Sequence, residues 1–325
     1  MGRAHCRLAI RLLARHKKHK EEHMRTKLAI LVLLTVGVGL SAMAADIVVG
    51  AKNFTEQYIG GNLIAILLEE NGYDVELREG MATTVMREAM VSGEVDIAMS
   101  YTGNGWLLFP EGGNAYDGET QLEMYEKARD HDVANGLVWL EPIWCNNTYA
   151  IAVTDGFASA NDVYTVSAFG DYVDANEGDV PFCTTFEFYA RPDGLLGVQL
   201  HYDFAFKPQV IKTVLAGLTF EPLINGEVEG TIVFGTDPIV AKENWVALQD
   251  DENFWPPYDL SPVVRQEILD EYPGIEDLLN SLVAAFPSDP AEARAEMTAL
   301  NARVDVDLLE PEEAAREWLI EKGLI

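Results

Sequence analysis

Two adjacent amides and a tyrosine form the most chemically distinctive group in this sequence. Asn146, Asn147 and Tyr149 lie within residues 141–153 (EPIWCNNTYAIAV), directly before an uncharged run with the aromatic and β-branched residues typical of a strand. A buried amide without a partner costs roughly 1–3 kcal/mol, so these side chains need hydrogen-bond partners. Either they face a ligand where the strand crosses between two lobes, or they form an Asn-Asn turn at the surface. The stretch alone favours neither.

Isolated basic and aromatic side chains elsewhere are further candidates for binding. Lys52 follows the first apolar stretch, and Tyr101 lies in the polar segment SYTGNGW at residues 100–106. Arg191 precedes a proline and could reach a cleft or pair with one of many surface carboxylates. For Lys52 and Tyr101 taken alone, a solvated lysine and a half-buried core aromatic are the commoner outcomes.

The N-terminal part of the chain has an alternation of strands and helices that could position these residues. NFTE at residues 53–56 has the spacing of a helix capping box. The predicted elements are strands at 46–51, 75–77 and 95–99, with helices from 53 to about 70 and over 83–91. This order predicts a parallel sheet with right-handed crossovers. Ligands gather at the carboxyl ends of such strands, where Lys52 and Tyr101 both lie.

The remainder of the chain continues as a mixture of strands and helices. We expect a second capping box at residues 184–187 (TTFE) and a helix over 208–225. From Ser261 onward we expect only helices, because three Ser, Asp or Glu residues each precede a proline that suits the first helical position. Other elements are expected as strands at 141–153, 180–183, 230–237 and 245–248 and a helix at 119–135.

Composition and charge indicate a folded protein with an acidic surface. The chain has 325 residues, 48% of them hydrophobic and 10% aromatic, which suffices for one large domain or two lobes. Residues 1–44 hold nine of the 23 Lys and Arg but only two of the 53 Asp and Glu. The rest therefore carries 14 positive and 51 negative charges, a net of −37. This charge argues against nucleic acids and anionic lipid head groups as partners.

Residues 24–44 have the three parts of a secretory signal peptide. Basic MRTK is followed by an apolar run at 28–40 and by the small-x-small site Ala42-Met43-Ala44. The apolar run is too short for an ordinary transmembrane helix, and no cysteine follows that could carry a lipid anchor. We therefore expect cleavage after Ala44 and a freely soluble periplasmic protein, with either Met1 or Met24 as the true start.

Cys145 and Cys183 are the two cysteines beyond this cleavage site. In an oxidising compartment an even pair of cysteines invites a disulfide bond, and both lie near stretches expected to face one cleft. The alternative is two buried thiols that pack as small apolar side chains. The sequence slightly favours the disulfide.

Several motifs, taken in order, resemble one family. The sequence is similar to the substrate-binding proteins of osmoprotectant ABC importers, which bind glycine betaine, choline, carnitine and related compounds. The resemblance covers nearly all of residues 46–325, and the ordered set of motifs is more specific than any single one. The matching stretches are 51–57 (AKNFTEQ), 101–104 (YTGN), 146–150 (NNTYA), 187–194 (EFYARPDG), 254–258 (FWPPY), 300–306 (LNARVDV) and 321–325 (EKGLI).

This resemblance implies a fold and a mode of action. The fold would be a two-lobe α/β periplasmic-binding-protein fold of type II, a Venus flytrap with two crossover strands. After an extension and signal peptide at 1–44, the first lobe would comprise 45–146 and 237–325, and the second 147–236. A monomer without a cofactor would capture an osmolyte in an aromatic box and deliver it to an ABC permease.

The resemblance also implies roles for individual residues. The box tyrosines of the family fall on Tyr101, Tyr149 and Tyr258, and the basic groups that clamp a carboxylate fall on Lys52 and Arg191. A fourth box position falls on Phe234, although that residue taken alone is better explained as strand core. Two positions depart from many relatives, since Asn104 replaces a threonine and Asn147 replaces an aspartate found in some of them.

Other functions remain as alternatives at this stage. The same fold could bind another zwitterion, such as an amino acid or a sulfonium osmolyte, or a polyamine, but a primary amine would need an acidic partner and Asn147 is neutral. An enzyme on this scaffold is the weaker alternative. Beyond residue 44 the histidines are His131 and His201, and we find no Ser-His motif, metal-ligand cluster or phosphate loop.

Overall fold

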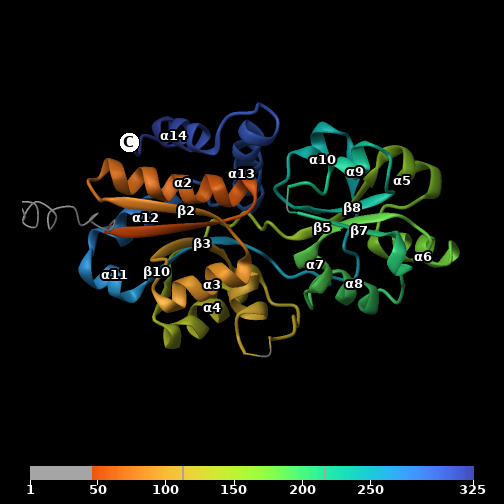
Figure 1. The fold of residues 1–325 in the computed structure, drawn as a ribbon, viewed down its shortest axis with the longest axis horizontal. Coiled ribbons are helices and arrows are strands. Elements are labelled where there is room, and N and C mark those ends of the chain that lie inside the picture. The colour runs from red at the N-terminus through yellow and green to blue at the C-terminus, as the bar shows by residue number, and fades with distance from the viewer. Residues whose placement is uncertain (1–45, 112, 216) are drawn as a thin grey trace, which may run out of the picture. The chain divides into compact units, whose positions relative to one another are not determined.

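The computed structural model describes residues 46–111, 113–215 and 217–325 of the chain (Figure 1). The predicted signal peptide and its cleavage site lie outside these residues. Within the described residues, no helix combines the length and the apolar character needed to cross a lipid bilayer. The strands form two separate sheets of five strands each.

The first sheet has the strand order β2-β1-β3-β10-β4. Strand β1 pairs in parallel with β2 and β3, as the βαβαβ pattern predicted. Strand β10 then runs antiparallel between β3 and β4, with Leu260 opposite Tyr101. The strand bounds are Ile47–Lys52 (β1), Val75–Met81 (β2), Ile97–Tyr101 (β3), Leu137–Trp139 (β4) and Leu260–Arg265 (β10).

The second sheet has the strand order β7-β6-β8-β5-β9. Strand β6 lies parallel to β7 and β8, whereas β5 runs antiparallel to β8 and β9. The antiparallel register places Tyr149 opposite Phe234, where β5 begins and β8 ends. The strand bounds are Tyr149–Thr154 (β5), Phe182–Thr185 (β6), Ile211–Val214 (β7), Gly230–Phe234 (β8) and Trp245–Ala247 (β9).

Helices cover the faces of both sheets (Figure 1). Those of the first lobe are α2 (Thr55–Glu70), α3 (Thr83–Ser92), η1 (Asn104–Leu108), α4 (Gln121–Asp132), η2 (Val133–Asn135), α11 (Gln266–Glu271), α12 (Gly274–Ala284), α13 (Pro290–Asp305) and α14 (Pro311–Lys322). Those near the second sheet are α5 (Asp155–Asn161), α6 (Val166–Ala175), α7 (Phe186–Ala190), α8 (Leu195–His201), η3 (Pro208–Val210), α9 (Glu221–Ile224) and α10 (Ile239–Lys242).

Each sheet has its own hydrophobic core. Helices α2, α12, α13 and α14 bury apolar side chains against one face of the first sheet, and α3 and α4 cover the other face. A cluster rich in phenylalanine, which includes Phe169, Phe182 and Phe206, fills the second sheet's core together with aliphatic side chains. Separate cores are the physical basis of a two-lobe fold, because each lobe can remain folded while the segments between them move.

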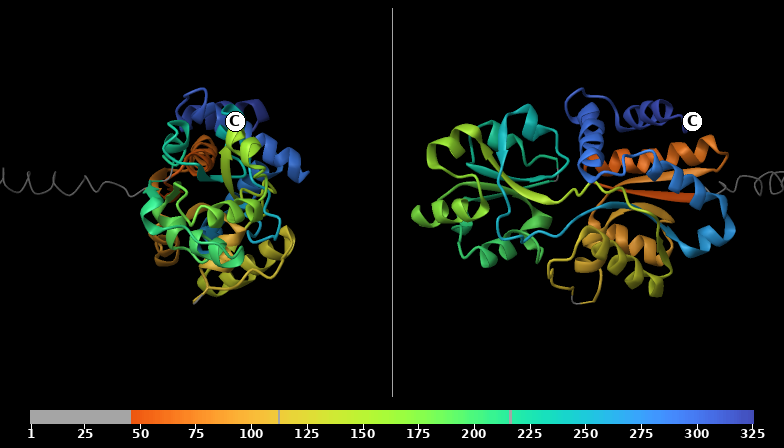
Figure 2. Two further views of the ribbon diagram at one scale, coloured as in Figure 1. Left: turned by 90° about the vertical axis from the view of Figure 1, so that its right-hand side faces the viewer. Right: turned by 180° about the vertical axis from the view of Figure 1, so that it is seen from behind.

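The chain passes twice between the sheets, once from β4 to β5 and once from β9 to β10 (Figure 2). The predicted second crossing at residues 234–236 is wrong. Strand β9 pairs with β5, and Leu248 and Trp255 belong to the core of the second sheet. The predicted boundary at residue 237 therefore cuts off part of the second sheet, because the chain returns only after Trp255.

Two predicted helices are also replaced by strands. Residues 208–225, predicted as one helix, contain β7 between two short helical turns. Ser261 and Pro262 lie inside β10, and Ser261 is fully buried rather than capping a helix. The other two proline signals are correct, since Asp289 caps α13 through its side chain and Glu310 precedes α14. Pairing with β3 and β4 outweighs the local helix signal at β10.

The predicted disulfide is absent, because Cys145 and Cys183 are both free and buried. Cys145 packs in the core of the first sheet, whereas Cys183 lies in β6 and packs with Leu223 and Val228. The two thiols therefore occupy different cores. Burial also raises the pKa of each thiol above its usual value, which makes both poor nucleophiles for disulfide formation.

We predict that the protein purified without reductant contains no Cys145–Cys183 linkage. Unfolding in the presence of an alkylating reagent should modify both cysteines, because each thiol is protected only by its core. Peptide mass mapping under non-reducing conditions checks this result. A cross-linked peptide containing both residues would contradict the assignment of the two thiols to separate cores.

Candidate functional site

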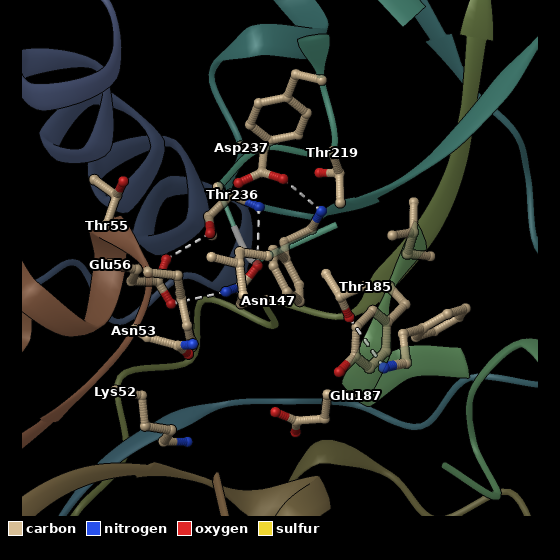
Figure 3. Close-up of a pocket in the computed structure, with 18 of the residues that line it drawn as sticks. Lys52, Asn53, Thr55, Glu56, Asn147, Thr185, Glu187, Thr219, Thr236 and Asp237 are labelled. Atoms are coloured by element: carbon tan, nitrogen blue, oxygen red, sulfur yellow. Dashed lines mark hydrogen bonds between the residues drawn. The ribbon is translucent and has the colours of Figure 1, made fainter. Parts of the chain in front are cut away.

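A cleft of about 690 Å³ is lined by residues from both sheets and from the segments between them (Figure 3). The eight binding residues expected from the sequence all line it, namely Lys52, Tyr101, Asn104, Asn147, Tyr149, Arg191, Phe234 and Tyr258. Lys52 and Tyr101 lie at the carboxyl ends of β1 and β3, where the strand order predicts a ligand. The fold therefore brings side chains more than 200 residues apart into one site.

Four aromatic side chains, Tyr101, Tyr149, Phe234 and Tyr258, form a continuous group that we call the aromatic box. Ring centroids of Tyr149 lie 5.2 Å from Phe234 and 5.6 Å from Tyr258, and Tyr258 lies 6.5 Å from Tyr101. Phe234 is half-buried and faces the cleft, so its interpretation as strand core alone is wrong. Tilted and edge-to-face arrangements of this kind are favourable for aromatic pairs and help to hold the ring orientations.

Lys52 is a buried basic group of the cleft without an ion-pair partner among the described residues. Its side chain is 2% exposed, and its Nζ lies 4.6 Å from the centre of the Tyr101 ring. Within the described residues it forms no ion pair. Burial lowers the pKa of Lys52 to about 7, although Glu187, toward which it points in Figure 3, opposes that effect. A ligand carboxylate would restore the charged form.

Arg191 is already engaged by carboxylates of its own lobe. Its Nε and Nη2 donate to both oxygens of Asp193, at 2.8 and 2.6 Å, and Nη1 donates to Glu187 at 3.1 Å. Nη2 also donates to Asn104 at 3.0 Å and Tyr258 at 3.1 Å. Burial opposes ionisation of Asp193, but these bonds prevail and hold its pKa below the usual value. Arg191 thus joins α7 to the first lobe.

The paired amides connect the crossing segments. The backbone N–H of Asn147 donates to the carbonyl of Tyr258 at 2.8 Å, and that of Tyr258 donates to Oδ1 of Asn146 at 2.9 Å. Thr236 donates its N–H to Oδ1 of Asn147 at 3.2 Å. The amides are therefore neither a surface turn nor unpartnered. They fix the two crossing segments beside the end of β8.

The sequence-based interpretation missed Glu56 at the centre of the site. The predicted capping box at 53–56 is wrong, because Phe54 occupies the cap position and no side chain bonds the helix start. Glu56 instead turns inward, is 3% exposed and accepts hydrogen bonds from Tyr101, Asn147, Thr236 and Asn301. An acidic residue inside the AKNFTEQ motif could have indicated a role in the site, but the spacing of Asn53 and Glu56 was equally well explained by a helix capping box.

Other cleft residues also escaped prediction. Phe54 stacks on Phe234 at a centroid distance of 5.5 Å, and Phe188 contacts Tyr149 at 4.7 Å. Asp237 accepts the N–H of Phe234 at 2.7 Å, and burial raises the pKa of its carboxyl to about 8. The cap predicted at Thr184 is one residue too early, since Thr185 is the cap and accepts from the N–H of Phe188. Local periodicity gives no sign of such contacts between distant segments.

This fold and cleft define a two-lobe solute-binding protein. Two α/β sheets with separate cores, two crossing segments and a shared cleft are its structural features. A family model described as the substrate binding domain of ABC-type glycine betaine transport systems, OpuAC, matches residues 45–321. The chain belongs to that family.

Similar proteins cover most of the chain. A glycine-betaine-binding protein of Pseudomonas aeruginosa is 33% identical over 291 residues, which cover 87% of this chain and 90% of that protein. The glycine betaine-binding protein YehZ of Escherichia coli is 30% identical over 302 residues, which cover 91% and 96%. The structure of apo YehZ aligns with a TM-score of 0.59, at 30% identity, over 87% of this chain and all of that chain.

We predict that Gly103→Ala destabilises the protein by displacing a box residue. A Cβ at Gly103 would lie 2.5 Å from the Tyr258 ring, so the ring or the η1 segment must move. Overpacking of this kind costs about 1–3 kcal/mol of unfolding free energy, which denaturant titration measures. Gly156→Ala in α5 is the matched control, since nothing lies within 4 Å of its added Cβ. Equal stability of the two variants would contradict the close approach.

Proposed function

We propose that this protein captures glycine betaine or a related quaternary ammonium osmolyte in the cleft and delivers it to the permease of an ABC importer. The observation that carries this proposal is the aromatic box beside one buried, uncommitted lysine. A trimethylammonium group has no N–H and cannot be recognised by hydrogen bonds. Ring faces can attract it, at about 0.5–2 kcal/mol each according to desolvation.

The ligand's carboxylate would bind Lys52 in this proposal. The resemblance placed both Lys52 and Arg191 on the basic positions of a carboxylate clamp, but the guanidinium of Arg191 is bound to Asp193 and Glu187. A carboxylate that reached Arg191 would have to displace one of them. Lys52 has no such competitor among the described residues and would gain a charge partner, so it is the stronger candidate.

The neighbourhood of Glu56 favours a quaternary over a primary ammonium. A primary amine needs acceptors for its N–H groups, and Glu56 is an acidic residue near the box. Both of its oxygens, however, already accept two hydrogen bonds each. A trimethylammonium group can lie near this carboxylate without displacing any donor. The same reasoning admits a sulfonium osmolyte as a second ligand, and we propose transport rather than catalysis as the protein's role.

The proposal also covers location and lobe movement. The signal peptide expected at residues 24–44 would export the protein to the periplasm, where it would act as a monomer. We propose lobes built on the two sheets, with the second lobe extending from Tyr149 to Trp255. Ligand contacts from both lobes would favour the closed form, because only that form makes all of them.

The proposed function is tested by isothermal titration with glycine betaine, choline, carnitine, proline betaine and dimethylsulfoniopropionate. We expect micromolar or tighter binding of at least one, which corresponds to about 8 kcal/mol. Alanine and putrescine, which carry N–H donors instead of methyl groups, should bind at least a hundredfold more weakly. Preferential binding of either would contradict the assignment of a quaternary ammonium ligand.

A matched pair of variants at Tyr149 should separate the contribution of its ring to ligand binding from that of its hydroxyl. The Tyr149 hydroxyl forms no hydrogen bond within the described residues, whereas its ring contacts Phe234 and Tyr258. We predict that Tyr149→Phe binds within twofold of the parent. Tyr149→Leu should weaken binding tenfold or more, about 1.4 kcal/mol, because it removes a π-face. Titration of both variants with the tightest ligand checks this, and equal affinities would exclude a cation–π role for Tyr149.

Binding of carboxylate ligands should weaken as the pH rises above about 7. The pKa of Lys52 is lowered to about 7 in the unliganded protein, and a bound carboxylate would raise it. Affinity for glycine betaine is then fully present below pH 7. It declines above pH 7, by about tenfold per pH unit at most, until the raised pKa of the complex is passed.

Choline, which lacks a carboxylate, is the control ligand for this pH profile and should show no such decline. Lys52→Met should abolish the pH dependence for glycine betaine, whereas Lys242→Met, at the edge of the same cleft, should preserve it. Titrations at pH 6, 7, 8 and 9 measure the profiles. Identical profiles for glycine betaine and choline would show that Lys52 does not receive the carboxylate.

A further inference from the structure

Glu56 is a buried carboxylate whose hydrogen-bond partners are all neutral. Oε1 accepts from the Tyr101 hydroxyl at 2.6 Å and from Nδ2 of Asn147 at 2.9 Å. Oε2 accepts from the Thr236 hydroxyl and from Nδ2 of Asn301 at 3.0 Å. Two of these partners are amide N–H groups, which can only donate, and the two hydroxyls can donate as well, so the arrangement suits an ionised carboxylate.

Glu56 has no ion-pair partner within the described part of the chain, although its charge and that of Lys52 attract each other at longer range. Other acidic groups at or beside the cleft are already engaged: Asp193 and Glu187 are bound to Arg191, and Asp305 accepts from Thr55. Asp237 accepts the N–H of Phe234, and burial raises its pKa to about 8. No ion pair joins Glu56 to any lysine or arginine that the structure describes. A buried charge without a partner is costly, so this position is suited to a cation that arrives with the ligand.

The position of Glu56 beside the aromatic box would place such a cation at the box. Its partner Tyr101 is a box residue, and Glu56 itself lines the cleft (Figure 3). Lys52 and Arg191 lie over the rings of Tyr101 and Tyr149, at 4.6 and 5.6 Å from the ring centres. Asp193 and Glu187 offset the charge of Arg191. Lys52 has no ion pair among the described residues and would repel a ligand ammonium unless a nearby negative charge offset it. Neutral aromatic faces alone do not supply that charge.

We propose that Glu56 is the specificity-determining carboxylate of this site, which selects a cationic head group over a neutral one of the same shape and also holds Tyr101 in the box. The inference rests on the proposed function, because it presumes a quaternary ammonium ligand. It adds a role for a residue that need not touch the ligand through a hydrogen bond. Glu56 acts through its charge and through the residues it orients.

Asn147 provides a way to test charge separately from packing. Its Oδ1 accepts from the N–H of Thr236, which directs Nδ2 toward Glu56. An aspartate at position 147 would keep the first bond and could accept a hydrogen bond from a glutamine at position 56. The double variant E56Q/N147D therefore moves the negative charge by one hydrogen bond while preserving the number of atoms.

The first experiment compares choline with its neutral carbon isostere, 3,3-dimethylbutan-1-ol. Titration and ligand-observed NMR would measure both compounds on the full chain and on E56Q. We expect E56Q to weaken choline at least tenfold and to change binding of the neutral isostere less than twofold. Glu79→Gln is the control, since Glu79 accepts from Asn62 outside the cleft, and it should leave both affinities unchanged.

The second experiment measures choline on E56Q/N147D, with circular dichroism and thermal unfolding as checks of folding. We expect the double variant to recover at least half of the affinity, on a logarithmic scale, that E56Q loses. If the neutral isostere binds too weakly to detect, the recovery of choline affinity in the double variant is the test of the proposal. If the double variant does not fold, the comparison of choline with the isostere on E56Q is the test.

Two results would overturn the inference. The first is a folded E56Q that binds choline like the parent, and the second is equal loss of choline and isostere with no recovery in the double variant. Either would make Glu56 a structural residue only. Absence of quaternary ammonium binding by the parent protein would instead refute the proposed function, so the two failures are distinguishable.

Discussion

Hydrogen bonds from four neutral side chains to the buried carboxylate of Glu56 connect the segments on which this structure depends. The donors come from the end of β3, from the first crossing segment, from the turn after β8 and from α13. A carboxylate left without these donors would be strongly destabilised in the interior, so the four segments are held at one point. The first crossing segment and one box residue therefore share a single anchor.

The rest of the site follows from where the strands end. Parallel pairing of β1 with β3 brings Lys52 and Tyr101 to one edge, and the register of β5 with β8 brings Tyr149 beside Phe234. The return segment then adds Tyr258 through its backbone bond to Asn147. Each lobe has its own core, so the aromatic groups meet in a cleft and are not buried in a single interior.

Local sequence patterns and family motifs predicted part of the fold and the residues that line the cleft. The first three strands and two helices follow from periodicity, and the eight expected site residues all line one cleft. Contacts between distant segments decided the rest. Residues 260–265 form a strand because β3 and β4 pair with them. Glu56 turns inward because four side chains there donate hydrogen bonds to it. Cys145 and Cys183 do not form a disulfide bond because each packs in a different core. Such partners cannot be inferred from spacing along the chain.

A crystal structure of the protein with glycine betaine tests the central claim most directly. We predict that the trimethylammonium group lies within about 6 Å of the ring centroids of the aromatic box, the cation–π range. We also predict that the carboxylate is hydrogen-bonded to Nζ of Lys52 and that Arg191 is still bound to Asp193. An ammonium group outside the box, or a carboxylate held by Arg191 while Lys52 remains unpartnered, would contradict this claim.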